Sequence, residues 1–220
     1  MMQAYRITLT GKMPLLMHAD NIEWADVMEQ WKANPNSKKI GKAGDDRTPA
    51  FRWIGCLYHD GTTIGMPNDN LMRCMMEGGA LVPVPGATRK TFKSQTQSGM
   101  LVEGSHWPLR VQGKEIAIAP ILTLQDEASF AEHKRVAREY GFDLYVKRAR
   151  IGQSKHVRVR PRFDEWAVEG LVRVWDEQIT SDVLTQIITQ AGYYKGLGDW
   201  RPGGKTPGPF GMFTATVRAA

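Results

Sequence analysis

Cysteine and long apolar stretches are scarce in this sequence, and each scarcity excludes a class of protein. The 220 residues contain two cysteines, Cys56 and Cys74, which form no CxxC pair. A disulfide scaffold and a cysteine-rich zinc site are therefore excluded. No run of about 18 apolar residues is present to form a membrane-spanning helix. The first residues also lack the apolar stretch of a signal peptide, so we expect no membrane partner and a cytoplasmic location.

Signatures of catalytic and cofactor chemistry are missing as well. The five histidines are isolated in sequence, so they indicate no metal site. The stretch GGKTPG lacks the spacing of a nucleotide-binding GxxxxGK[ST] loop, because the required glycine position holds Asp199. Asp45 and Asp46 are adjacent, but we expect them in a solvated loop rather than at a metal. The sequence therefore predicts no catalytic residue, no metal and no cofactor.

Acidic residues are absent from one strongly basic segment. Residues 147–162, KRARIGQSKHVRVRPR, carry +7, whereas the whole chain carries +6, so the remainder is close to neutral at −1. Val157 and Val159 alternate with arginines, which predicts a strand with one apolar and one cationic face. Unpaired cations on one face repel each other, and a phosphate backbone would relieve that repulsion. The predicted contacts are Lys147, Arg148, Arg150, Lys155, His156, Arg158, Arg160 and Arg162.

Glycine is concentrated in one connection, residues 196–211, between an expected helix and an expected strand. The connection also contains Trp200, Arg201 and Lys205. It follows a helix instead of opening one, so the phosphate-binding geometry of a helix N-terminus does not apply. Glycine allows a backbone to approach another chain or a nucleic acid closely. We expect Arg201 and Lys205 to reach phosphates and Trp200 to stack on bases.

Residues 83–115 are rich in glycine, proline and lysine, which predicts an inserted, thumb-like arm on a single domain spanning residues 1–220. Arg89, Lys90 and Lys93 lie on either side of Phe92 in this arm. Cations interleaved with an aromatic ring suit a single strand, because its bases can stack on the ring. The arm therefore supplies a second candidate contact surface.

The order of the expected elements predicts the fold class. Strands are expected at residues 3–13, 115–124, 157–163, 166–175 and 211–219. Helices that bear on the fold are expected at residues 68–81 and 181–196. A β-α-β-β-α-β order with insertions is typical of a ferredoxin-like (RRM-like) core. We therefore expect an α+β fold with this core, an inserted arm and a C-terminal glycine-rich loop.

Three stretches together resemble the RAMP superfamily, the repeat-associated proteins of CRISPR effector complexes. They are YRITLTGKMPLLM (residues 5–17), IGMPNDNLMRCMMEGG (64–79) and GLGDWRPGGKTPGPFGMFTATV (196–217). They are similar to the first strand, to the segment that opens a helix near bound RNA, and to the glycine-rich loop of that superfamily. The resemblance implies that Asn68, Asn70 and Arg73 contact phosphates and that the arm grips a neighbouring subunit. The usual Gly-Ser-Ser is Asn68-Asp69-Asn70 here, and GGKTPG expands the loop.

A second resemblance gives a setting. RVRPRFDEWAVEG and AGYYKGLGDWRP are similar to a family of uncharacterised proteins common in phage and prophage genomes, which implies the cytoplasm of a bacterial host cell. The sequence therefore favours a non-enzymatic protein that binds single-stranded nucleic acid, phage DNA slightly ahead of RNA, and forms a homo-oligomer or filament along it. Three alternatives stay open: a guide-RNA-binding backbone subunit of a CRISPR effector complex, a RAMP-type endoribonuclease with His18 as acid–base, and a structural phage protein.

Overall fold

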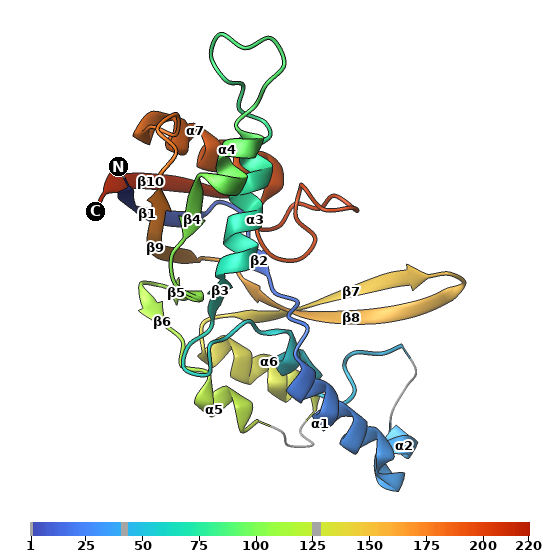
Figure 1. Cartoon of the computed structure of the whole chain (residues 1–220). Coiled ribbons are helices and arrows are strands. Elements are labelled where there is room, and N and C mark those ends of the chain that lie inside the picture. Colours follow the sequence, from blue (N-terminus) through green and yellow to red (C-terminus); the bar gives the residue numbers. More distant parts are fainter. Residues whose placement is uncertain (1, 41–43, 125–128) are drawn as a thin grey trace.

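The computed structural model describes residues 2–40, 44–124 and 129–220 of the chain, and its fold is α+β (Figure 1). The strands are β1 (Gln3–Gly11), β2 (Leu15–Leu16), β3 (Gly65–Pro67), β4 (Met100–Val102), β5 (His106–Val111), β6 (Lys114–Glu115), β7 (Asp143–Ile151), β8 (Ser154–Phe163), β9 (Ala167–Val174) and β10 (Phe213–Ala219). The helices are α1 (Ile22–Ala33), α2 (Pro35–Ile40), α3 (Asn68–Gly79), α4 (Lys93–Ser98), α5 (Ala119–Leu122), α6 (Phe130–Glu139) and α7 (Ser181–Gln190). A 3₁₀ turn, η1 (Arg52–Cys56), and a π-helical turn, η2 (Ala191–Lys195), complete the described elements.

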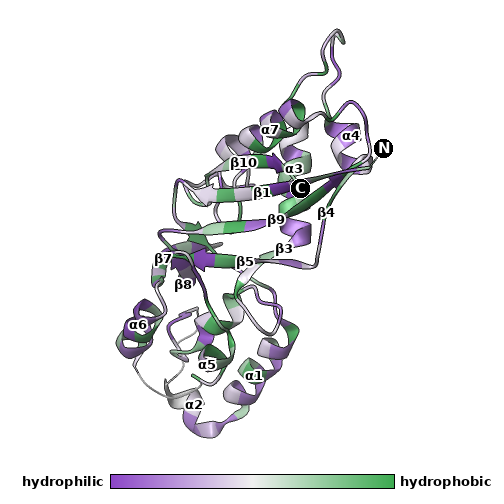
Figure 2. Cartoon of the chain, turned by 90° about the vertical axis from the view of Figure 1, so that its left-hand side faces the viewer, coloured by the Kyte–Doolittle hydropathy of each residue, from purple (hydrophilic) through white to green (hydrophobic). Residues whose placement is uncertain are grey.

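The larger sheet has the strand order β10-β1-β9-β5-β3, with β4 paired to β9 and β6 paired to β5. Strand β1 lies between β10 and β9 and is antiparallel to both. Tyr5, Ile7 and Leu9 are buried at alternate positions of β1, as expected for a strand with one face in the core. Helix α7 packs on β10, and α3 packs on α7 and β4. Figure 2 shows β10, β1, β9 and β5 side by side, with α1, α2, α5 and α6 grouped below them.

The smaller sheet has the order β2-β8-β7, and its β7–β8 hairpin extends away from the body of the molecule (Figure 1). Buried aromatic rings join the base of this hairpin to the helices. The Phe142 ring centroid is 5.6 Å from that of Trp53 in η1 and 4.9 Å from that of Phe163 at the end of β8. The hairpin therefore has a rigid base and a projecting end.

Two expectations about the fold are corrected by the structure. Residues 115–124 form no continuous strand, because β6 ends at Glu115 and α5 begins at Ala119. Pro120 lies in the first turn of α5, where a backbone N–H has no partner within the helix, so proline is tolerated there. Residues 83–115 do not form one arm, because β4 and β5 pair with β9 in the larger sheet. Only residues 81–92, which we call the finger, extend from the body between α3 and α4 (Figure 1).

The finger has its own backbone hydrogen bonds. The Val84 N–H donates to the Lys90 carbonyl at 2.9 Å, and the Phe92 N–H donates to the Val82 carbonyl at 3.0 Å. Val82 and Phe92 are buried, so they anchor the finger at its base. Within the described residues, no helix has both the length and the apolar character needed to span a membrane.

Candidate functional site

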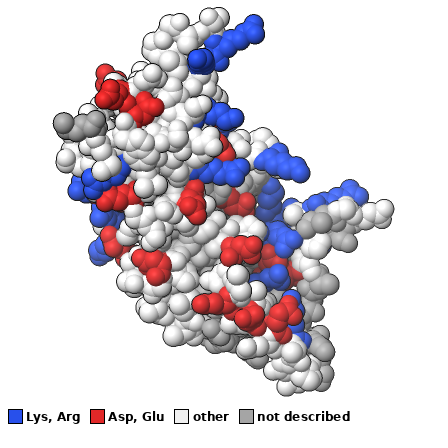
Figure 3. All heavy atoms as spheres, viewed as in Figure 1, with Lys and Arg blue, Asp and Glu red and all other residues white. Residues whose placement is uncertain are grey.

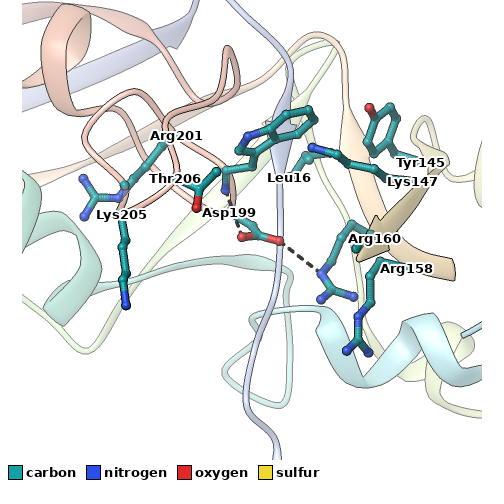
Figure 4. A pocket seen from close by; sticks show the side chains of 13 residues that line it. Leu16, Tyr145, Lys147, Arg158, Arg160, Asp199, Arg201, Lys205 and Thr206 are labelled. Atoms are coloured by element: carbon teal, nitrogen blue, oxygen red, sulfur yellow. Dashed lines mark hydrogen bonds and ion pairs between the residues drawn. The ribbon is translucent and has the colours of Figure 1, made fainter. Parts of the chain in front are cut away.

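The hairpin and the glycine-rich loop form the two sides of one groove of about 480 Å³ (Figure 4). The charged residues that line it are Lys147, Arg158, Arg160, Arg201, Lys205 and Asp199. The two basic segments that the sequence predicted separately are thus brought together. Five cations and one carboxylate face the same space.

The pairing of β7 with β8 decides which cations face the groove. Lys147 lies opposite Arg158, and Tyr145 lies opposite Arg160. Directly opposed residues of an antiparallel pair share a face of the sheet. His156 and Arg162 belong to this groove face by their register. Arg148, Arg150 and Lys155 belong to the other face, near the hairpin end, so the predicted contacts are divided between two surfaces.

The arginines of the groove face already have carboxylate partners, which corrects the expectation that they are unpaired. Arg158 Nη1 lies 3.3 Å from Asp46 Oδ1, and Arg160 Nη1 lies 3.6 Å from Asp46 Oδ2. Asp46 is 6% exposed and therefore does not lie in a solvated loop. Its backbone N–H donates to the Val157 carbonyl at 2.9 Å, so residues 44–46 pair along β8 and hold the carboxylate beside the arginines.

Arg160 also joins β8 to the glycine-rich loop. Its Nε donates to Asp199 Oδ2 at 3.1 Å, and its Nη2 lies 3.1 Å from Nε2 of His18 (Figure 4 shows the Asp199 contact). Burial, followed by the charge of Arg160, lowers the pKa of His18 below its ordinary value. The lowered pKa favours the neutral imidazole, which lies beside Arg160 but does not line the groove itself.

Arg162 and Arg201 are paired with carboxylates as well. Arg162 Nε donates to Asp164 Oδ1 at 2.7 Å. Arg201 contacts both oxygens of Glu77 on α3, at 2.8 and 3.2 Å, and Arg73 contacts the same carboxylate at 3.1 Å. Burial opposes ionisation of Glu77, but its hydrogen bond to Arg201 prevails and lowers the pKa of this carboxyl. The predicted contacts Arg73 and Arg201 therefore meet at one acid.

The glycines of the loop serve its own tight folding. Gly198 and Gly211 have φ of +75° and +71°, which favour glycine. A Cβ at Gly198 would lie 2.2 Å from the Leu16 carbonyl oxygen, because the Asp199 N–H donates to that oxygen at 2.8 Å. The Gly211 N–H donates to the Pro14 carbonyl at 2.8 Å. Both ends of the loop are thus fastened to the chain on either side of Leu15.

Trp200 belongs to an aromatic cluster at the groove. Its ring centroid is 5.4 Å from that of Phe210 and 6.5 Å from that of Tyr145, and Lys147 Nζ lies over the indole. Trp200 has φ of +50°, which is uncommon for a bulky residue, and its Nε1 donates to the Pro207 carbonyl at 3.1 Å. The loop therefore holds the indole in one position. Tyr145 was missed in the sequence, although its period-two spacing to Lys147 places both on one face.

The predicted aromatic contact of the finger is corrected by burial. Phe92 is 2% exposed and packs in the core, so it cannot stack on a base. Arg89, Lys90 and Lys93 are exposed, the first two on the finger and Lys93 at the start of α4. The finger thus retains its cations but has lost its proposed stacking ring.

Asn68 and Asn70 lie in the first turn of α3. The Asn68 N–H donates to the Ser105 carbonyl at 3.1 Å, and the Asn70 side chain hydrogen-bonds to Tyr58. Tyr58 in turn donates to the carbonyl of His18 at 2.9 Å. Asn70 is therefore tied to the His18 side of the site, whereas Arg73 is tied to the loop.

Figure 3 shows Lys and Arg side chains spread along the side that carries the finger, the glycine-rich loop and the hairpin, with Asp and Glu among them. Within the described ranges, no three His, Cys, Asp or Glu side chains are grouped so that they could hold a metal ion.

No model of a known protein family matches this chain, and no curated protein matches its sequence.

Proposed function

We propose that this chain binds single-stranded nucleic acid in the groove between the hairpin and the glycine-rich loop, without catalysing a reaction, and that copies assemble along the strand. The observation that carries the proposal is the meeting of two basic segments around an aromatic cluster. Cations that track a backbone, combined with rings that accept bases, are the two features of sequence-tolerant single-strand binding. Phage DNA is the favoured strand.

Affinity would come mainly from the cations without carboxylate partners. Lys147 on the hairpin and Lys205 in the loop line the groove, and neither makes an ion pair with any described residue. Each phosphate that such a cation neutralises releases counterions. Arg158 and Arg160 would fix the position of the strand more than they would raise its affinity, because Asp46 and Asp199 offset their charge.

We also propose that the chain belongs to the RAMP superfamily, and the order of its strands and helices supports this proposal. Strands in the order β10-β1-β9-β4, with α3 after β1 and α7 before β10, are the arrangement expected of a ferredoxin-like core. The glycine-rich loop lies between the last helix and the last strand, as the resemblance implies. The hairpin and the finger extend beyond the body, which supports contacts with neighbouring copies (Figure 1).

Fluorescence polarisation with labelled oligo-dT and oligo-U of about 30 nucleotides tests the proposal, with a gel to show whether the strand stays intact. We expect binding that weakens with salt, with a slope of about −0.7 per neutralised phosphate on a log–log plot. Binding of RNA alone would favour the guide-RNA-binding subunit. Absence of binding to both strands would refute the proposal and favour a protein partner for the basic face.

An endoribonuclease is the second candidate, because His18 lies beside Arg160, an arginine that lines the groove, and its lowered pKa favours the neutral imidazole. A neutral histidine beside an arginine can accept a proton while the cation stabilises a phosphate. This candidate predicts shortened RNA in the gel. It also predicts that His18→Ala abolishes shortening while leaving polarisation intact.

A further inference from the structure

A second hollow, of about 580 Å³, runs along helix α3 and shares no described lining residue with the groove. We call it the α3 cleft. Its floor contains the apolar side chains of Met72, Met76 and Ala80. These positions are four residues apart, so they lie on one face of the helix. All three are partly exposed, so α3 presents an apolar stripe that solvent can reach.

Helix α4 and the turn η2 both pack on α3, and they form the walls of the α3 cleft. Lys93 and Gln97 come from α4, and Lys195 comes from η2. Neither lysine makes an ion pair with any described residue. The cleft therefore combines an apolar floor with cationic walls.

Two acids also line the α3 cleft, but neither pairs with these lysines. Glu77 is held by Arg73 at 3.1 Å and by Arg201 at 2.8 Å. Asp69 lies in the first turn of α3, whereas the finger leads from the end of α3 to Lys93, so this acid and this lysine lie at opposite ends of the helix. With Arg201 included, four cations and two carboxylates leave an excess of two positive charges.

Helix α1 carries a surface of complementary character. One stripe of this helix is exposed along its whole length, and it consists of Ile22, Ala25, Asp26, Glu29 and Ala33. Ile22 is 81% exposed, more than any other large apolar side chain that the structure describes. Trp24 and Met28 lie on the opposite face of the helix and are buried. The outer stripe of α1 is therefore apolar and acidic, and this fold leaves it uncovered.

The acids of α1 are available to a partner. Asp26 makes no ion pair with any described residue, and Glu29 pairs with Lys32 of the same helix at 2.6 Å. An exposed pair of this kind is worth well under about 1 kcal/mol, so Glu29 can exchange its partner at little cost. An apolar helix stripe in an apolar groove, with opposite charges at the rim, is a common mode of helix recognition.

The two surfaces lie in different parts of the molecule. Figure 1 shows α3 and α4 in the upper half and α1 at the lower end, with the hairpin between them. The α1 helix of one chain therefore does not reach the α3 cleft of the same chain, whereas the α1 helix of a neighbouring copy can. A contact between two different surfaces repeats from copy to copy and produces an open chain when its rotation does not close a ring.

We infer that helix α1 of one copy docks in the α3 cleft of the next copy, and that this contact joins the copies into a chain. Assembly along a strand rests on the proposed function, whereas the docking contact rests on the two surfaces alone. A contact that is one helix wide buries less than about 1,200 Å², which is typical of weak association. A shared strand would raise the effective concentration of neighbouring copies and strengthen the contact.

Reversal of charge on each surface tests the inference. Sedimentation velocity of the free protein at low salt, at up to about 300 μM, should show association that increases with concentration. Asp26→Lys reverses a charge on α1, and Lys195→Glu reverses a charge in the α3 cleft. Each should weaken association about tenfold. An equimolar mixture of the two variants should recover it, because each reversed surface then meets a reversed partner.

Two further variants make this test specific. Glu165→Lys removes an exposed acid between β8 and β9, outside both surfaces, so it should associate like wild type. Gln97→Glu adds a negative charge to the cleft without changing the shape of the side chain, and it should weaken association as Lys195→Glu does. Urea unfolding establishes that the variants are folded. Variants that associate like wild type, or a mixture that associates no better than each variant alone, would overturn the inference.

Oligo-dT of about 8 nucleotides, a length that a single copy can cover, separates this inference from the proposed function. Asp26 lies outside the groove, so Asp26→Lys should bind this oligonucleotide like wild type. Strand binding without charge-dependent association of the protein would overturn the inference and leave strand binding standing. Charge-dependent association without binding of any strand would support the docking contact and refute the proposed function.

Discussion

The Arg160 guanidinium donates to the Asp199 carboxylate at 3.1 Å, and this contact fastens the hairpin to the glycine-rich loop across the groove. Arg160 is 11% exposed at its side chain, whereas Asp199 is 37% exposed. The arginine therefore belongs to the floor of the groove, and the carboxylate faces the space that a strand would occupy. Several measurable consequences follow from this asymmetry.

Asp199→Asn should strengthen strand binding. Among the described residues that line the groove, the change removes the one negative charge while keeping the shape of the side chain. A unit charge at close range in water is worth about 1 kcal/mol, so we expect a gain of about fivefold at low salt, shrinking as salt screens it. Fluorescence polarisation measures the gain, and Asp164→Asn outside the groove is the control. Weaker binding by Asp199→Asn would mean that the carboxylate accepts hydrogen bonds from the strand.

Asp46→Asn should unfold more easily than wild type. The substitution leaves three guanidinium groups around a buried site without their shared carboxylate. Removing one partner from a buried ionic cluster typically costs about 3–5 kcal/mol. Urea unfolding measures the loss, and Asp164→Asn, an exposed partner of Arg162, should cost less than about 1 kcal/mol. If both variants lost less than about 1 kcal/mol of unfolding free energy, solvent would be stabilising the three guanidinium groups without Asp46.

The Lys147→Gln/Lys205→Gln double variant should weaken binding with little loss of stability. Both side chains line the groove, and neither makes an ion pair with a described residue. Each lost phosphate contact should flatten the log–log salt slope by about 0.7. A matched control is Lys114→Gln/Arg218→Gln, which removes two exposed cations from β6 and β10. An unchanged slope in the groove variant would show that these lysines do not contact the strand.

Substitution of Phe92 should reduce stability, whereas substitution of Trp200 should reduce strand affinity. Phe92→Ala empties a core position, so we expect a loss of about 3–5 kcal/mol in unfolding free energy and little change in the affinity of the folded protein. Trp200→Ala should reduce strand affinity by about 1–3 kcal/mol, the range for one stacked base. Trp200→Phe keeps a ring and should recover part of that affinity. Equal affinities of the Ala and Phe variants would show that the indole does not stack on the strand.

Stability should fall when the pH is lowered from 7.5 to 5.5. Burial lowers the pKa of His18 and of His106 below the ordinary 6.5. The unfolded chain therefore takes up protons at a higher pH than the folded chain, and acidification favours unfolding in this window. Urea unfolding at both pH values measures the effect. His18→Asn and His106→Asn should each flatten the dependence, and a wild type equally stable at both pH values would contradict the prediction.

The sequence predicted the elements with clear periodicity. The alternation of Tyr5, Ile7 and Leu9 located β1, and helix α3 occupies Asn68–Gly79 within the expected range. β7 was missed, because KRAR shows no apolar alternation and its partner strand lies across a turn at Gly152 and Gln153. The apolar pattern of the sequence therefore predicted those elements whose own side chains form the core.

The acids of the site could not be predicted in the same way. Asp46 and Arg158 are 112 residues apart, and GKAGDDRTPA has the composition of an exposed loop. Only the backbone pairing of residues 44–46 with β8 makes Asp46 a buried counter-ion. The cations were visible in the sequence because they are consecutive along one segment. Their partners were not, since folding brings them from elsewhere in the chain.

The fastening of the glycine-rich loop to Pro14 and Leu16 has a thermodynamic consequence. A free loop with six glycines would lose conformational entropy on closing around a ligand, at about 1–2 kcal/mol per ordered residue. Here the hydrogen bonds of Asp199 and Gly211 order the loop when the chain itself folds. A strand that enters the groove therefore meets a preorganised wall. The ordering cost of binding falls mainly on the flexible nucleic acid, which favours strands that are already extended.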